Sequence, residues 1–276
     1  MSVERRVVTS VFPSNVSICS SFLEVASLTC AVSEYHIGVD EAGRGPSIGP
    51  MVVCALSIPK SDRDYLLELG VDDSKRLSKK RRESIYDGLI SNLQLRGWGL
   101  GLEICNPSSI DKWMADGTLN SLEVQLFAKS INIAGTPSSV SSIFLDACDV
   151  NSERFGRNVS TALGRRWGNC KIQSEHKMDS KDPVVGAASI IAKVSRDEEI
   201  RILSEKIGLE LGSGYPSDQL TKKAVDYLCS GESPHDVLRW SWANVRRSWT
   251  MQNAGVMPRR KSESGESSQS TLGDWK

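Results

Sequence analysis

Four acidic residues, at three separate places in the chain, have the type and position to do chemistry. Asp40 and Glu41 follow a short apolar run, Asp146 ends another, and Asp179 precedes a long segment rich in Ala and Ile. The carboxyl end of a strand is the usual position of functional side chains in an α/β sheet. If the four carboxylates meet, their repulsion raises their pKa values, and divalent cations relieve it.

The ligand types predict the metal. A site of carboxylate oxygens without Cys or His favours Mg²⁺ or Mn²⁺ over Zn²⁺. Two such ions ~4 Å apart clamp the attacking water and the leaving oxygen of an in-line displacement at phosphorus. We therefore expect a phosphodiester-cleaving site with two divalent ions. Sequence spacing does not by itself bring the acids together, and a polar loop capping a strand explains Asp40 and Glu41 equally well.

A glycine-rich loop follows the first pair of acids, in the segment GVDEAGRGP at residues 38–46. Adjacent side chains on a strand point to opposite faces unless the chain turns, and Gly43 and Gly45 are expected to supply that turn. Glycines also let the backbone approach a ligand closely and present amide donors to it.

The elements that must position these residues follow from the hydrophobic pattern. Strand-like runs occupy residues 36–39, 51–58, 98–104, 142–145 and 170–173. Helical patterns cover residues 79–93, 119–133, 152–163, 183–202, 218–228 and 237–249. Strands come early and helices accumulate later, which predicts a mixed sheet covered by helices, an α/β or α+β layer fold.

Composition excludes several classes of protein. The 276 residues carry a formal net charge of zero, so any nucleic-acid binding must come from local basic patches. Seven scattered cysteines without a C-x-x-C pair argue against a disulfide framework and against a structural zinc site. No apolar run approaches the ~18 residues needed to cross a bilayer, so no membrane association is expected.

Eight collinear segments resemble one known family, type 2 ribonuclease H, in particular the catalytic subunit of the eukaryotic enzyme or its archaeal relative. They are GVDEAGRGPSIGPM (38–51), DSKRL (73–77), residues 98–101, LNSLE (119–123), FLD (144–146), HKMDSKDPVVGAASIIAKVSRD (176–197), GSGYPSD (212–218) and RWSWANV (239–245). The stretches DEAGRG and AASIIAKV are highly specific to the family.

The resemblance implies an α/β, ribonuclease H-like fold with a mixed central sheet, flanking helices and a helical C-terminal extension. It implies that Asp40, Glu41, Asp146 and Asp179 bind the metal ions and are catalytic. The implied activity is cleavage of the RNA strand of RNA–DNA hybrids, and cleavage 5′ to single ribonucleotides in duplex DNA, leaving 5′-phosphates. Such an enzyme would remove misincorporated ribonucleotides and RNA primers.

The same resemblance implies the substrate contacts. Backbone groups of Gly43, Arg44 and Gly45 would contact the ribose 2′-hydroxyl, the group that separates RNA from DNA. Tyr215 lies where the family tyrosine stacks on the next sugar. We also expect Lys75 to contact phosphate, and Lys193 to do so unless it pairs with an acid on its own helix.

The resemblance covers residues 35–255 as the catalytic domain, and leaves residues 1–34 as an N-terminal extension. Residues 256–276 are rich in Ser, Glu and Gly and are expected to be a disordered tail. Gln269, Leu272 and Trp275 in that tail match a sliding-clamp-binding peptide, although Lys276 replaces its second aromatic.

The two relatives imply different partners and compartments. The eukaryotic subunit works in a heterotrimer in the nucleus, whereas the archaeal enzyme acts alone in the cytoplasm; both are intracellular. The family pattern usually has an aromatic where this chain has Asp182, and Ser where it has Gly186. Two rival functions are a non-catalytic hybrid-binding subunit and a nuclease for DNA junctions. The intact set of acids disfavours the first, and the glycine loop the second.

Overall fold

The computed structural model describes residues 34–72, 74, 76–253 and 255–260. Within these residues, five strands form one sheet in the order β3-β2-β1-β4-β5. The strands are β1 (Tyr35–Ala42), β2 (Met51–Pro59), β3 (Gly99–Cys105), β4 (Val140–Asp146) and β5 (Lys171–Glu175). β1 pairs antiparallel with β2 and parallel with β4, so the sheet is mixed, as the sequence predicted.

The order of the strands places the acids. β1 is the central strand, and its parallel neighbour β4 runs beside it with Val39 opposite Leu145. The carboxyl ends of parallel strands lie at the same edge of a sheet, so Asp40 and Asp146, which each follow one of these residues, come to one edge.

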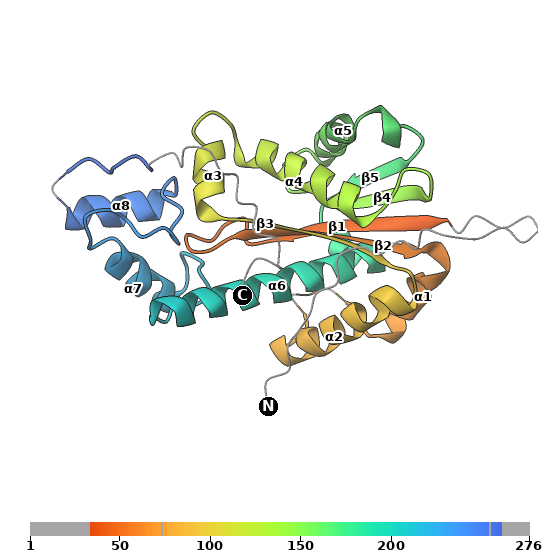
Figure 1. Cartoon of the computed structure of the whole chain (residues 1–276), viewed down its shortest axis with the longest axis horizontal. Coiled ribbons are helices and arrows are strands. Elements are labelled where there is room, and N and C mark those ends of the chain that lie inside the picture. Colours follow the sequence, from red (N-terminus) through yellow and green to blue (C-terminus); the bar gives the residue numbers. More distant parts are fainter. Residues whose placement is uncertain (1–33, 73, 75, 254, 261–276) are drawn as a thin grey trace, which may run out of the picture.

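Helices cover both faces of the sheet (Figure 1). One face carries α4 (Leu119–Ala134) and α5 (Ser152–Leu163), and the other carries α6 (Pro183–Ile207) with α1 (Arg63–Glu68) and α2 (Lys79–Leu95). Short 3-10 turns at Lys60–Asp62, Arg165–Trp167 and Met178–Ser180 (η1 to η3) join these elements. The helix α3 (Pro107–Trp113), which the sequence pattern did not reveal, precedes α4.

Burial on both faces explains why β2 reads as a continuous apolar run. Met51, Val53 and Ala55 pack with α4 and α5, while Val52 and Cys54 pack with α2 and α6. A half-buried strand alternates apolar and polar residues, whereas a strand buried on both faces does not.

Glycine allows the long helix α6 to lie against the central strand. A Cβ built on Gly38 in β1 would lie 2.4 Å from the backbone carbon of Val184 and from the nitrogen of Val185. The first turn of α6 therefore packs on bare β1 backbone. This contact holds the segment that carries Asp179 against the strand that carries Asp40.

The C-terminal part forms a small third core at one end of the sheet, with α7 (Gln219–Leu228) and α8 (Ala243–Gln252) packed on the end of α6. The predicted helix 237–249 was wrong in its first half. The backbone amides of Arg239, Trp240 and Ser241 bond to Ser47 and Asp111 instead of to a helix. None of the helices within the described ranges has the length and apolar character to cross a membrane.

Candidate active site

Three of the four predicted acids converge. One carboxylate oxygen from each of Asp40, Asp146 and Asp179 lies within 4.8 Å of the other two. Asp40 and Asp179 are each 4% exposed, and Asp146 is half-buried at the end of β4. Three carboxylates this close, two of them buried, form a donor set of hard oxygen atoms suited to Mg²⁺ or Mn²⁺.

A tight turn before α6 brings Asp179 to this edge. The backbone N–H of Met178 donates to Asp146 Oδ1 at 2.9 Å, which ties the turn to the end of β4. Lys177 has a φ of +57°, in the left-handed region that residues other than glycine rarely adopt. Strain of this kind persists where the surrounding structure enforces it, often at functional sites.

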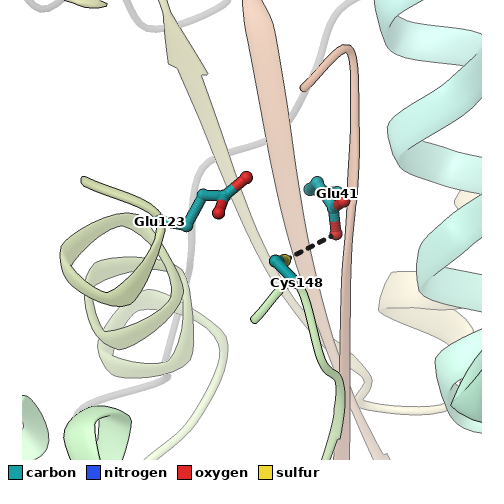
Figure 2. Close-up of side chains that lie close together, drawn as sticks. All are labelled: Glu41, Glu123 and Cys148. Carbon is teal, nitrogen blue, oxygen red and sulfur yellow. Dashed lines mark hydrogen bonds between the residues drawn. The ribbon is translucent and has the colours of Figure 1, made fainter. Parts of the chain in front are cut away.

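Glu41 lies in an adjoining group. β1 continues as regular strand through Ala42, so Asp40 and Glu41 leave the strand on opposite faces and the turn begins only at Gly43. At this edge of the sheet their carboxyl groups still come within hydrogen-bond reach of each other. Oxygen atoms of Glu41 and Glu123 and the sulfur of Cys148 lie within 4.8 Å of one another (Figure 2). The Cys148 thiol donates to Glu41 Oε2 at 3.2 Å.

The two groups are electrostatically linked. Burial, followed by the charges of Glu41 and Asp146, raises the pKa of Asp40 well above its usual value. Burial and the charge of Glu41 raise the pKa of Glu123 to about 8. Both pKa shifts mean that these carboxylates are destabilised in their charged form. A bound cation would relieve that destabilisation.

Two buried arginines from distant segments, Arg239 and Arg196, pack against the glycine loop. Arg239, in the C-terminal part, donates to the carbonyls of Gly43, Arg44 and Gly49 at 2.6, 2.9 and 3.0 Å. Gly43 has a φ of +88°, and a Cβ there would lie 2.4 Å from Arg196 Nε. Only glycine fits at this position without strain.

The side chain of Arg44 turns away from the loop toward α4. Its Nε bonds Glu123 Oε1 at 2.7 Å, and its terminal nitrogen bonds Asn120 Oδ1 at 2.6 Å. Only the backbone of Arg44, whose carbonyl accepts a hydrogen bond from Arg239, is therefore part of the loop surface.

Tyr215, which is expected to stack on the next sugar, lies next to the loop. It is half-buried, and a Cβ on Gly45 would lie 3.8 Å from its ring. Lys193 forms an ion pair with an acid of its own helix, Asp197, whose Oδ1 lies 2.7 Å from Lys193 Nζ. This is the alternative to a phosphate contact that the sequence left open. Arg196, three residues further on, is 1% exposed and faces the interior rather than sharing an exposed surface with Lys193. Lys75, Gln269, Leu272 and Trp275 lie outside the described residues.

The two departures from the family pattern have structural roles. Asp182 is the N-cap of α6, where its Oδ1 accepts from the N–H of Val184 at 2.8 Å, and its Oδ2 bonds Arg63 at 2.6 Å. A Cβ on Gly186 would lie 2.9 Å from the carbonyl oxygen of Asp179, so glycine allows this turn to pack closely.

Sequence reasoning missed three residues of the site. Glu123 and Arg239 stand inside the matching segments LNSLE and RWSWANV, so the signal was present, but neither residue was given a role. Cys148 was counted only as one of several unpaired thiols. Its neighbours Glu41 and Glu123 are remote in sequence, and spacing gives no sign of them.

Comparisons with known proteins identify the family of the chain. The family model described as Ribonuclease HII matches residues 37–245. The chain is similar to Ribonuclease HII of Methanocella arvoryzae, with 41% identity over 221 residues, 80% of this chain and 91% of the relative.

Solved structures have the same fold. The ribonuclease H2 of Pyrococcus horikoshii OT3 superposes with a TM-score of 0.69 at 34% identity, over 79% of this chain and 98% of that one. The ribonuclease HII in a complex with PCNA from Archaeoglobus fulgidus gives 0.64 at 36% identity, over 75% and 94%. Bst-RNase HIII, solved with Mn²⁺, gives 0.67 at 20% identity over 87% and 77%, a likeness of fold alone. The chain belongs to the ribonuclease HII family.

Proposed function

We propose that this endoribonuclease hydrolyses the RNA strand of RNA–DNA hybrids, and cleaves 5′ to single ribonucleotides in duplex DNA, with Asp40, Glu41, Asp146 and Asp179 as its catalytic residues. The observation that carries the proposal is the convergence of Asp40, Asp146 and Asp179 at the edge between two parallel strands. Membership of the ribonuclease HII family supports the substrate class.

Two divalent ions, Mg²⁺ or Mn²⁺, are the proposed cofactors. The donors fit, because hard carboxylate oxygens lie close together and the pKa of Asp40 is raised by burial and by its acidic neighbours. A relative of the same fold was solved with Mn²⁺. When bound, such ions activate the attacking water and stabilise the leaving oxygen. Asp40, Asp146 and Asp179 would hold them, with Glu41 reaching in from the neighbouring strand position.

The glycine loop supplies the proposed selectivity for RNA. Backbone groups of Gly43, Arg44 and Gly45 would bond the 2′-hydroxyl, with Tyr215 stacked on the next sugar. A site built to pair with a hydroxyl leaves its own polar groups unpaired when that hydroxyl is absent, and can reject the analogue by ~10⁴-fold. The fixing of the loop by Arg239 supports this role, because a positioned donor discriminates better than a mobile one.

A duplex DNA with one ribonucleotide tests the proposal. With Mg²⁺, cleavage is expected on the 5′ side of the ribonucleotide, leaving a 5′-phosphate. Asp146→Asn should lower kcat at least ~10³-fold while retaining binding of the duplex, because it removes a charge that acts on the reaction rather than on binding. Asp64→Asn, the same change at an exposed residue of α1, is the matched control and should cleave normally.

Three results would contradict the proposal. An uncut strand with tight hybrid binding would favour the non-catalytic subunit. Equal cutting of all-DNA duplexes would favour the junction nuclease. Full activity of Asp146→Asn would remove the acidic group from the reaction.

We also propose that the tail binds a sliding clamp through Gln269, Leu272 and Trp275. Support comes from the motif and from the Archaeoglobus relative, which was solved in a complex with PCNA. A peptide of residues 265–276 should bind the clamp in calorimetry, and Leu272→Ala with Trp275→Ala should abolish binding, because the apolar plug is then lost. Unchanged binding of the double variant would refute the assignment.

A further inference from the structure

We propose that Glu41, Glu123 and Cys148 form a second site, adjoining that of Asp40, Asp146 and Asp179, for a thiophilic divalent cation, Zn²⁺ or Cd²⁺. The three residues come from β1, α4 and the loop after β4, and their side chains point toward one another (Figure 2). One ligand atom from each lies within 4.8 Å of the other two. The site differs chemically from the carboxylate group of Asp40, Asp146 and Asp179, because it includes a sulfur.

The buried carboxylate of Glu123 is a second, independent observation that favours a bound cation. Its side chain is 0% exposed, and its Oε1 is committed to Arg44 at 2.7 Å. Its Oε2 is buried and has no hydrogen-bond partner among the described residues. A buried carboxylate oxygen without a partner is costly, and a bound cation would supply that partner.

The dimensions suit a zinc ion. If the three ligand atoms were all at the maximum separation, a point between them would lie about 2.8 Å from each, against ~2.0–2.3 Å for Zn–O and Zn–S bonds. Small side-chain rotations close that gap. Three protein ligands and one water is the usual set of an open four-coordinate zinc site.

The charges also balance. Two carboxylates and one thiolate carry three negative charges, and a divalent cation together with the Arg44 guanidinium carries three positive charges. On binding, the ion forms bonds to Cys148 Sγ and to a carboxylate oxygen of Glu123. Two protons leave to solvent: the thiol proton now donated to Glu41, and the proton that Glu123 holds at neutral pH because its pKa is about 8. No oxidation or reduction takes place. Thiolate sulfur selects Zn²⁺ or Cd²⁺ over Mg²⁺, which binds oxygen.

Occupancy of this site would inhibit cleavage. This consequence rests on the proposed function, because Glu41 is one of the proposed catalytic acids and would be drawn toward the thiophilic ion. An excess of Mg²⁺ would not displace that ion, since Mg²⁺ has little affinity for sulfur. The binding itself does not depend on the proposed function.

Cd²⁺ binding to the full-length protein, in excess Mg²⁺, tests the site. Bound Cd²⁺ should produce the ultraviolet absorption of a cadmium–thiolate bond at one equivalent. Cys148→Ser should remove that absorption, because this variant lacks the thiolate ligand. Glu123→Gln should weaken Cd²⁺ binding at least ~10-fold, because this variant lacks one carboxylate ligand. Cys170→Ser is the matched control: Cys170 is also half-buried, but its thiol donates to the Val140 carbonyl. It should bind Cd²⁺ like the unmodified chain.

Anomalous diffraction from crystals grown with Cd²⁺ gives a result that needs no variant, and a peak is expected between the three side chains. No absorption in the unmodified chain, absorption retained in Cys148→Ser, or a peak elsewhere would overturn the site. Cd²⁺ should also inhibit cleavage by the unmodified chain and by Cys170→Ser. Binding without inhibition would refute the competition for Glu41, whereas a lack of any cleavage in Mg²⁺ would refute the proposed function and leave the binding result intact.

Discussion

The substitution Arg239→Met tests whether cleavage depends on the hydrogen bonds that hold the glycine loop in place. Arg239 is fully buried and donates to the carbonyls of Gly43, Arg44 and Gly49, while Met fills a similar volume without a donor. Burial, together with the neighbouring Arg196 charge, lowers the pKa of Arg239 to about 9, so the guanidinium remains charged at neutral pH.

The size of the effect follows from these three bonds. Hydrogen bonds from a charged donor contribute ~1.5–3 kcal/mol each, so their gross loss is ~5–9 kcal/mol. Part of the loop can relax toward water, since Gly45 is exposed, and we expect a net loss of about 3–5 kcal/mol. At ~2–4 °C per kcal/mol in a domain of this size, Tm should fall by about 10 °C. A loop displaced by ~1 Å should lower kcat/KM ~100-fold.

Thermal unfolding and cleavage of a duplex with one ribonucleotide, below the lowered Tm, measure the two effects. Arg247→Met, the same change at an exposed position of α8, is the control and should alter neither. Arg239→Lys should fall between the two, since an ammonium cannot bond three carbonyls in the geometry of a guanidinium. If Arg239→Met kept its Tm, or kept full kcat/KM with unchanged preference for RNA, the loop would not depend on this residue.

Three further predictions follow from packing and charge. Asp182→Ala removes the N-cap of α6 and the partner of Arg63, and should cost about 2–3 kcal/mol in urea unfolding; a loss below ~1 kcal/mol would contradict the cap. Gly38→Ala places a Cβ against the backbone of Val184 and should cost about 3 kcal/mol, and a neutral effect would show that α6 can move away. Without divalent ions, stability should fall as pH rises from about 4.5 to about 8, because folded Glu123 keeps a proton that the unfolded chain has lost. Urea titrations in a chelator should show this slope, and Glu123→Gln should flatten it; identical slopes would refute the pKa assignment.

The sequence predicted most of the regular structure because its signals there are local. The helix expected at residues 152–163 has those bounds in the structure, since Asn151 caps it by accepting from the N–H of Arg154. The mixed sheet covered by helices was also predicted correctly, and comparison with solved structures confirms the ribonuclease H-like fold.

The predictions that failed concern residues whose hydrogen-bond partners are distant in sequence. Residues 237–242 have helical spacing, but Asp111 and Ser47 take their amides, and neither partner is visible in the local pattern. The grouping of Glu41 with Glu123 and Cys148 likewise requires three elements to meet. Motif resemblance predicted four acids, of which Asp40, Asp146 and Asp179 lie together, but the contacts of Arg239 with the loop carbonyls appear only in the tertiary structure.

The hydrogen bonds from Arg239 to the glycine loop also affect when the loop becomes ordered during synthesis of the chain. Gly43 and Arg239 are separated by roughly 200 residues, which a ribosome adding ~5–20 residues per second takes ~10–40 s to synthesise. During that interval β1 and its acids have been synthesised, while the residue that fixes the loop after them has not. The nascent chain therefore lacks the hydrogen bonds that fix the glycine loop until the C-terminal part has been made, and under the proposed function it cannot select a ribonucleotide before then.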